Sequence, residues 1–94
     1  MQFAKPLRPR VQRGEITCSV RIWKQPRVKV GGRYVLPPGE IEVVSLRGIT
    51  RGEITPELAR RSGFDSVEDL LRVAQHGEGE FVFLVEFVYH GPAR

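Results

Sequence analysis

The segment Phe81–Tyr89 is the longest apolar stretch of the chain, and it constrains the fold more than any other. Only Glu86 interrupts it, and bulky side chains recur at every second position: Phe81, Phe83, Val85, Phe87 and Tyr89. A period of two is typical of a β-strand, and apolar residues between these positions indicate burial on both faces. We therefore predict a strand in the middle of a sheet, whose aromatic side chains make up much of the core.

Another period of two begins after Glu15. Four apolar residues alternate with more polar ones and predict a strand with one buried face: Ile16, Cys18, Val20 and Ile22. Arg21 and Trp23 then lie together on the opposite face of this strand. Cys18 is the only cysteine of the chain, and a single thiol in an apolar strand is typical of a core position.

Two adjacent glycines divide the following segment. Gly31 and Gly32 can supply the positive φ angles of a tight turn. We therefore predict that Arg27–Val30 and Arg33–Leu36 form a hairpin-like pair of strands around them.

A further strand is predicted over Ile41–Ile49, after a proline pair that interrupts the chain. Most of its positions suit a sheet, but Val43 and Val44 are adjacent apolar residues. This pair indicates either burial on both faces or a β-bulge.

Two short helices are predicted before the last strand. The first starts at Thr55–Glu57, where a threonine cap, a proline and an acid fit the N-terminus of a helix, and it ends at Gly63. The second starts at Asp65 or Ser66 and ends near His76. Its apolar residues repeat with the helical spacing: Val67, Leu70, Leu71 and Ala74.

The length and composition fit one small domain. The chain has 94 residues and a hydrophobic content of 40%, which suffices for a single core, so we predict one domain spanning residues 1–94. No apolar run approaches the roughly 18 residues that cross a bilayer, and Met1–Arg13 lacks the apolar region of a secretory signal. We therefore expect a soluble cytoplasmic protein without a membrane partner.

The charges of the chain are unevenly distributed. Residues 1–35 carry nine cationic side chains against one acid, Glu15, whereas residues 36–94 carry six cations and ten acids. Such asymmetry favours a polyanionic partner on one face. We expect this partner to be RNA or a nucleotide; the alternative is a solvated basic surface that binds nucleic acid only non-specifically.

Several of these segments together resemble the ASCH domain (activating-signal-cointegrator homology), whose fold is similar to the RNA-binding PUA domain. The resemblance covers nearly the whole chain and rests on the order of five parts: residues 14–21, 30–34, 54–57, 62–70 and the closing aromatic strand. It implies an α+β fold, a PUA-like β-barrel of five to six mostly antiparallel strands with two short helices on one side. The chain would be a small stand-alone member of that family. Twelve of its 15 basic residues are arginine and it has no asparagine, which suits a prokaryotic source.

The first of these parts, residues 14–21, matches only half of the defining residues of the family's chemical motif. The motif, Gly-x-Lys-x-x-(Glu or Thr)-x-Arg, lines a cleft of the barrel; Gly14 and Arg21 match it, whereas Ile16 and Ser19 replace the lysine and the acid or threonine. Relatives that hydrolyse acetylated cytidine use a lysine, a threonine and a glutamate, and the aligned positions here hold Ile16, Ser19 and Ser62. A serine without a neighbouring base is a poor nucleophile, so we assign no catalytic residue.

The resemblance and the charge pattern together define a candidate site. The expected cleft residues are Gly14, Ser19, Arg21 and Tyr34. The residues expected to contact phosphates and bases are Lys5, Arg8, Arg10, Arg13, Arg21, Trp23, Lys24, Lys29 and Arg33. The alternatives are a salt-bridged arginine, a core tryptophan, a core tyrosine and, for the N-terminal cations, a flexible basic tail in solvent.

No metal or cofactor site is expected. His76 and His90 lack the spacing of metal ligands, and we predict surface positions for both. The scattered acids are predicted to be solvated rather than paired as catalytic carboxylates: Glu40, Glu42, Glu78, Glu80 and Glu86.

Two other functions stay open from the sequence. The first is an enzyme, a nucleoside amidohydrolase or a ribonuclease, to whose cleft Lys5, Lys24 or Glu42 contributes from elsewhere in the fold. The second is a protein-interaction adaptor that recruits its partner at an exposed strand edge.

Overall fold

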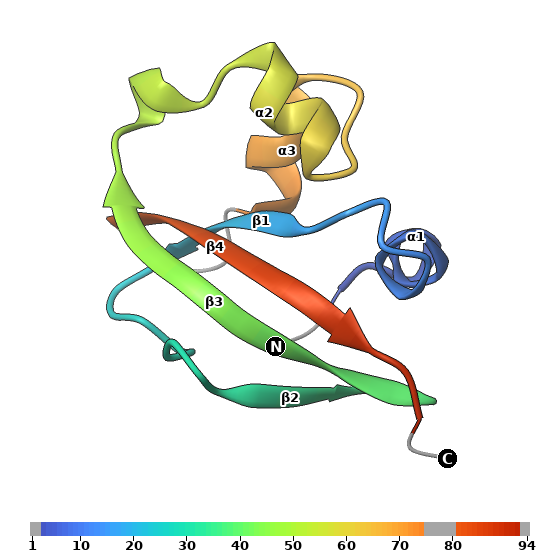
Figure 1. The fold of residues 1–94 in the computed structure, drawn as a ribbon. Coiled ribbons are helices and arrows are strands. Elements are labelled where there is room, and N and C mark those ends of the chain that lie inside the picture. Colours follow the sequence, from blue (N-terminus) through green and yellow to red (C-terminus); the bar gives the residue numbers. More distant parts are fainter. Residues whose placement is uncertain (1–2, 75–80, 93–94) are drawn as a thin grey trace.

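The computed structural model describes residues 3–74 and 81–92, and within them the fold is α+β. Figure 1 shows the helices and strands in chain order, which are η1 (Lys5–Leu7), α1 (Arg8–Gln12), β1 (Cys18–Trp23), β2 (Arg33–Leu36), β3 (Gly39–Ile49), η2 (Arg51–Glu53), α2 (Pro56–Arg61), α3 (Val67–Ala74) and β4 (Phe81–His90). Here η marks a single 3-10 turn.

The four strands form one antiparallel sheet in the order β1-β4-β3-β2, which is curled in Figure 1. The prediction of a central last strand is confirmed, because β4 pairs with β1 on one side and with β3 on the other. Adjacent residues of β4, such as Leu84 and Val85, are both buried, so both faces of the strand are covered. Its aromatic residues fill the core only in part: Phe87 is 1% exposed, but Phe81 is 56% exposed.

A β-bulge interrupts β3 where the two valines are adjacent. Val43 pairs with Phe87 and Ser45 with Glu86, so the register shifts by one residue between them. Val43 is fully buried and the intervening Val44 is exposed. The bulge is therefore one of the two predicted alternatives, and it lets the strand bend.

The predicted glycine hairpin is wrong. Arg27–Val30 is not a strand, and β2 pairs instead with β3 around Pro37 and Pro38. Gly31 does form a turn with a φ of +84°, but its amide donates to the carbonyl of Val43 over 2.7 Å. This bond ties the turn to β3. The sheet has four strands within the described residues rather than the five or six expected, because Arg27–Val30 does not add one.

Helices α2 and α3 cover one face of the sheet, as predicted, and lie together beside β1 in Figure 1. The threonine cap is confirmed, since the Thr55 hydroxyl accepts a hydrogen bond from the Leu58 amide over 3.1 Å. The hydroxyl of Ser66, rather than Asp65, caps α3 by accepting from the Asp69 amide. The apolar cluster between helices and sheet includes the predicted β1 residues Cys18, Val20 and Ile22.

The N-terminal segment covers the opposite face. Phe3 and Val11 are buried in a second apolar cluster with Ile16, Val43 and Phe87, and the rings of Phe3 and Phe87 meet edge to face at 5.4 Å. A flexible basic tail is therefore wrong for this segment, because its apolar side chains anchor it to the sheet.

The remaining predictions on segments concern the membrane and the end of the second helix. Within residues 3–74 and 81–92, no helix combines the length and the hydrophobicity of a membrane span. His76, Glu78 and Glu80, with the predicted helix end near His76, lie outside the described residues.

Candidate nucleic-acid interface

A cleft of about 720 Å³ lies between β1, the N-terminal segment and α3. Ser19, Arg21 and Trp23 line it from β1, since residues two apart in a strand point to the same face. Phe3 and Val73 are among the residues that line it from the N-terminal segment and from α3. Its size is within the range of roughly 300–1,000 Å³ typical of small-molecule sites.

Arg21 is the central charged group of this cleft. Its Nε donates a hydrogen bond to the Ser19 hydroxyl over 2.8 Å, and its guanidinium lies 5.3 Å from the centre of the Phe3 ring. Burial lowers the pKa of Arg21 to about 10, because removal from water disfavours the charged form. The cleft thus holds a cation with reduced hydration, a favourable environment for an anion.

An aromatic ring and a second arginine complete the cleft. Trp23 is half-buried, lines the cleft and lies 5.9 Å from the ring of Phe83, centre to centre. Arg27 is exposed and also lines the cleft. Arg21 and Arg27 are the charged residues among the described lining, so its fixed charge is positive.

The predicted N-terminal cations do not extend this lining. Arg10 and Arg13 both form ion pairs with Glu15, and these pairs lower the pKa of the Glu15 carboxyl. The Nε of Arg8 donates to the carbonyl of Phe3 over 3.2 Å, which holds a wall of the cleft in place. Lys5 is exposed on η1 and is not among the described lining residues.

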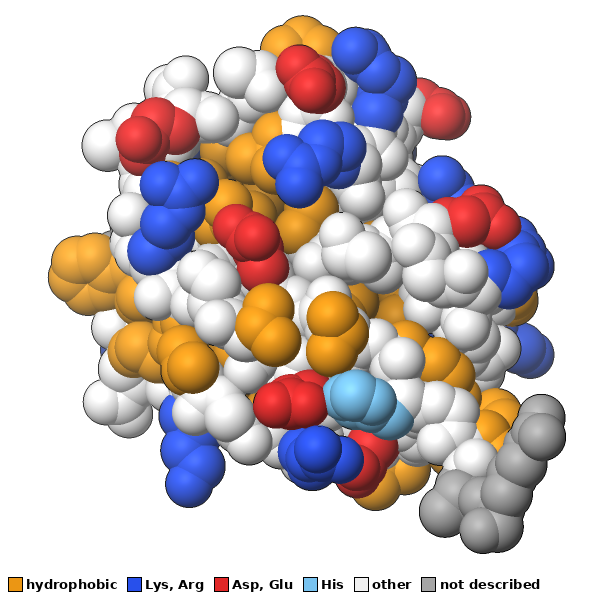
Figure 2. All heavy atoms as spheres, in the orientation of Figure 1, with side chains coloured by type: hydrophobic (Ala, Val, Ile, Leu, Met, Phe, Trp, Pro, Cys, Tyr) orange, Lys and Arg blue, Asp and Glu red, His pale blue; other side chains and the backbone are white. Residues whose placement is uncertain are grey.

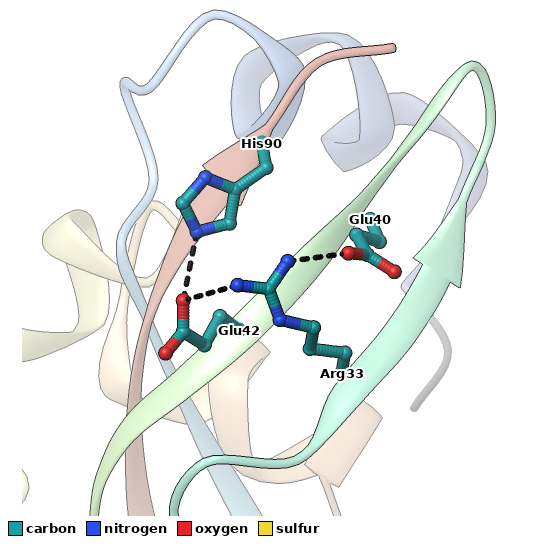
Figure 3. Close-up of polar contacts among 4 residues, drawn as sticks. All are labelled: Arg33, Glu40, Glu42 and His90. Carbon is teal, nitrogen blue, oxygen red and sulfur yellow. Dashed lines mark hydrogen bonds and ion pairs between the residues drawn. The ribbon is translucent and has the colours of Figure 1, made fainter. Parts of the chain in front are cut away.

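Arg33 lies in a separate network, drawn in Figure 3. Its guanidinium contacts Glu40 over 2.7 Å and Glu42 over 3.4 Å, and Glu42 also contacts the His90 ring over 2.9 Å. Two carboxylates offset the charge of one guanidinium, so this end of the sheet is not part of a positive surface. Glu40 and Glu42, which were predicted to be solvated, remain partly exposed but also form ion pairs with Arg33. The surface position of His90 is confirmed.

Two predicted cleft residues have other positions. Gly14 has a φ of +77° and its amide bonds the Val11 carbonyl, so it ends α1. Tyr34 packs against the second apolar cluster, and its hydroxyl accepts from the Lys29 amide over 3.1 Å. Neither residue is among those that line the cleft in the described structure.

The three positions aligned with the amidohydrolase residues do not meet. Ile16 is 1% exposed inside the second apolar cluster, and Ser62 is buried with its hydroxyl 3.6 Å from the thiol of Cys18. Ser19 instead contacts Arg21 in the cleft. Cys18 and Ser19 point to opposite faces of β1, so this strand separates the two serines. No group of three or more metal-ligating side chains occurs among the described residues.

The surface as a whole is mixed in charge. On the face drawn in Figure 2, cationic and acidic side chains alternate, with apolar side chains between them. Lys24 and Lys29 are exposed in the connection between β1 and β2 but are not among the described lining of the cleft. The basic character that the sequence concentrates in its first third therefore reaches the cleft through Arg21 and Arg27.

Comparisons with protein-family models, with curated proteins and with solved structures found no match to this chain.

The apolar walls of the cleft were not predicted from the sequence. Phe3 and Leu7 stand alone among basic residues and prolines, and Phe64 follows a helix stop, so no periodic pattern includes them. Their isolation in a charged segment was the available signal, because large apolar residues are more often buried than charged ones.

Proposed function

We propose that this chain is an RNA-binding domain of PUA-like type, related to the ASCH family, that takes an unpaired nucleotide into the cleft at Arg21. The observation that carries this proposal is a partly desolvated guanidinium inside a cleft, beside an indole. A nucleotide has a group that complements each of them: its phosphate is an anion for the guanidinium, and its base is a π surface for the indole.

The phosphate part of the recognition is assigned to Arg21 and Arg27. Arginine binds phosphate oxygens through two parallel N–H donors, and such a pair is stronger where water is partly excluded. Ser19 orients the guanidinium through the bond to its Nε. Arg27, exposed at the same cleft, adds a second positive charge.

The base part is assigned to Trp23. Its indole lines the cleft and is only half-buried, so part of the ring faces the cleft, where a base can stack on it. Stacking of a base on an aromatic ring contributes about 1–3 kcal/mol and tolerates any base. We therefore expect little sequence preference from this contact alone.

The experiment is a fluorescence anisotropy titration of a labelled single-stranded RNA with the wild-type chain and with Arg21→Gln. We expect binding that weakens as salt rises from low to physiological levels, because phosphate neutralisation releases counterions. Arg21→Gln should weaken it by roughly ten-fold or more, the range expected for a charged hydrogen-bonded pair. Arg72→Gln, in an exposed ion pair with Asp69 on α3, is the matched control.

Two results would overturn the proposal. RNA affinity that does not respond to salt favours the adaptor interpretation instead. Multiple turnover of acetylcytidine or of RNA that Ser19→Ala abolishes would make the chain an enzyme.

A further inference from the structure

A second hollow, of about 440 Å³, lies where β3 ends and β4 begins. Its described lining consists of residues 48–51 and 81–83, and the charged residue among them is Arg51. Phe81 and Phe83 supply its aromatic surface; Phe81 is 56% exposed. An exposed aromatic ring beside a hollow offers a flat surface on which a planar group can stack.

Gly48 opens this hollow. It pairs with Phe83 across the sheet, so a side chain at this position points to the same face as the Phe83 ring. A Cβ placed on Gly48 would meet nothing within 4 Å. A glycine weakens the interior of a strand and often marks the approach of a ligand, and here its missing side chain leaves space beside the ring.

The linings of the hollow and of the Arg21 cleft touch through two aromatic rings. Trp23, which lines the cleft, lies 5.9 Å from Phe83, which lines the hollow, with their ring planes inclined by 36°. Trp23 is also the cross-strand partner of Phe81, and Arg21 is that of Phe83. Two cross-strand pairs on one face therefore join a phosphate-binding group to a row of three rings.

We propose that the hollow beside Gly48 stacks a second base of the same RNA strand, so that the ligand is a single-stranded segment of at least two nucleotides. This inference rests on the proposed function of the Arg21 cleft. Bases inside a duplex already stack on one another and cannot lie on protein rings, whereas the bases of a single strand can. Arg51 at the rim has the charge that complements a phosphate.

The test compares adenosine monophosphate with oligoadenylates of two to six nucleotides. The chain contains one tryptophan, so its single indole N–H signal in a nitrogen-15 NMR spectrum reports on the cleft. Affinities are measured for the wild type, for Gly48→Ile, which fills the hollow, and for Phe81→Ala, which removes an exposed ring. Val88→Ile enlarges an exposed side chain on the opposite face of β4 and is the control.

For the wild type we expect the affinity to rise by roughly ten-fold or more from the mononucleotide to the short oligonucleotides, as one added stacked base predicts. Gly48→Ile and Phe81→Ala should retain the mononucleotide affinity and lose this gain, and Val88→Ile should retain both. Isoleucine suits a strand, and both variants act at exposed positions, so thermal unfolding should be little changed.

The outcomes separate the two proposals. An indole signal that no adenylate shifts overturns the proposed function and the second site with it. Two outcomes overturn the second site but leave the proposed function of the Arg21 cleft intact. The first is a wild type that binds the mononucleotide and every oligonucleotide with equal affinity. The second is that Gly48→Ile and Phe81→Ala both keep the full gain in affinity. A duplex that competes as well as the single strand also overturns the second site.

Discussion

The Nε of Arg21 donates a hydrogen bond to the hydroxyl of Ser19 over 2.8 Å, within one face of β1. The hydroxyl is a neutral acceptor, so it orients the guanidinium without offsetting its charge, unlike the carboxylates that contact Arg33. Arg21 lines the cleft, whereas Arg33 lies in the network with Glu40 and Glu42 at another end of the sheet.

Arg21→Met should weaken RNA binding without lowering stability. Methionine retains much of the aliphatic stem but removes the charge whose burial is unfavourable, and replacing buried charges by apolar groups of similar volume is often neutral or stabilising. Urea unfolding and anisotropy titration measure the two effects. A methionine variant with a markedly lower free energy of unfolding and unchanged affinity would assign Arg21 a structural role.

Ser19→Ala should weaken RNA binding by a smaller factor than loss of Arg21. The lost hydrogen bond is worth about 1 kcal/mol, which corresponds to roughly five-fold in affinity. Ser19→Thr keeps the hydroxyl and should restore most of the affinity. If the Ser19→Ala and Ser19→Thr variants bind RNA equally well, the Ser19 hydroxyl does not position the guanidinium of Arg21.

The salt dependence of binding should distinguish Arg21 from Arg33. Each phosphate contact on a single strand contributes about 0.7 to the slope of log affinity against log salt. We expect Arg21→Gln to reduce the slope by about this amount and Arg33→Gln to leave it unchanged, because Glu40 and Glu42 already pair with Arg33. Equal slope changes for both variants would contradict this assignment.

Stability should depend on pH through Arg21 above pH 10. The pKa of Arg21 in the folded chain is about 10, below the ordinary value of an exposed arginine. In this window the unfolded chain binds more protons, so the contribution of Arg21 to the free energy of unfolding rises with pH. Below pH 10 the buried guanidinium is charged, and it then lowers the free energy of unfolding by its full amount. The free energy of unfolding is measured for the wild type and for Arg21→Met at roughly pH 9 and pH 11. We expect the difference between the two chains to change with pH, and a difference that is equal at both pH values would contradict this prediction.

Thr55→Ala should destabilise the fold by about 1 kcal/mol, since the Thr55 hydroxyl caps α2 through the Leu58 amide. Thr55→Ser preserves the cap and should restore most of the stability in chemical denaturation. The cleft lies outside α2, so RNA affinity should be unchanged in both variants. An alanine variant as stable as the wild type would exclude a contribution from this cap.

Local features of the chain were predictable from the sequence. The period of two predicted β1 and β4, and Thr55 predicted the start of α2. The adjacent Val43 and Val44 indicated either burial on both faces or a bulge, and the bulge is the one that forms. Each of these depends on contacts between residues close in sequence, so the pattern of residue types is sufficient. Arg21 and Trp23 were placed on one face for the same reason.

The sequence by itself therefore determined that β1 and β4 are strands, that Thr55 caps α2, and on which side of β1 Arg21 lies. Only the tertiary structure decided that β2 pairs with β3, that Glu40 and Glu42 pair with Arg33, and that Phe3 forms a wall of the cleft. The physical reason is that strand pairing and side-chain contacts join residues far apart in the chain. Periodicity and charge do not specify such partners; the packing of the whole sheet does.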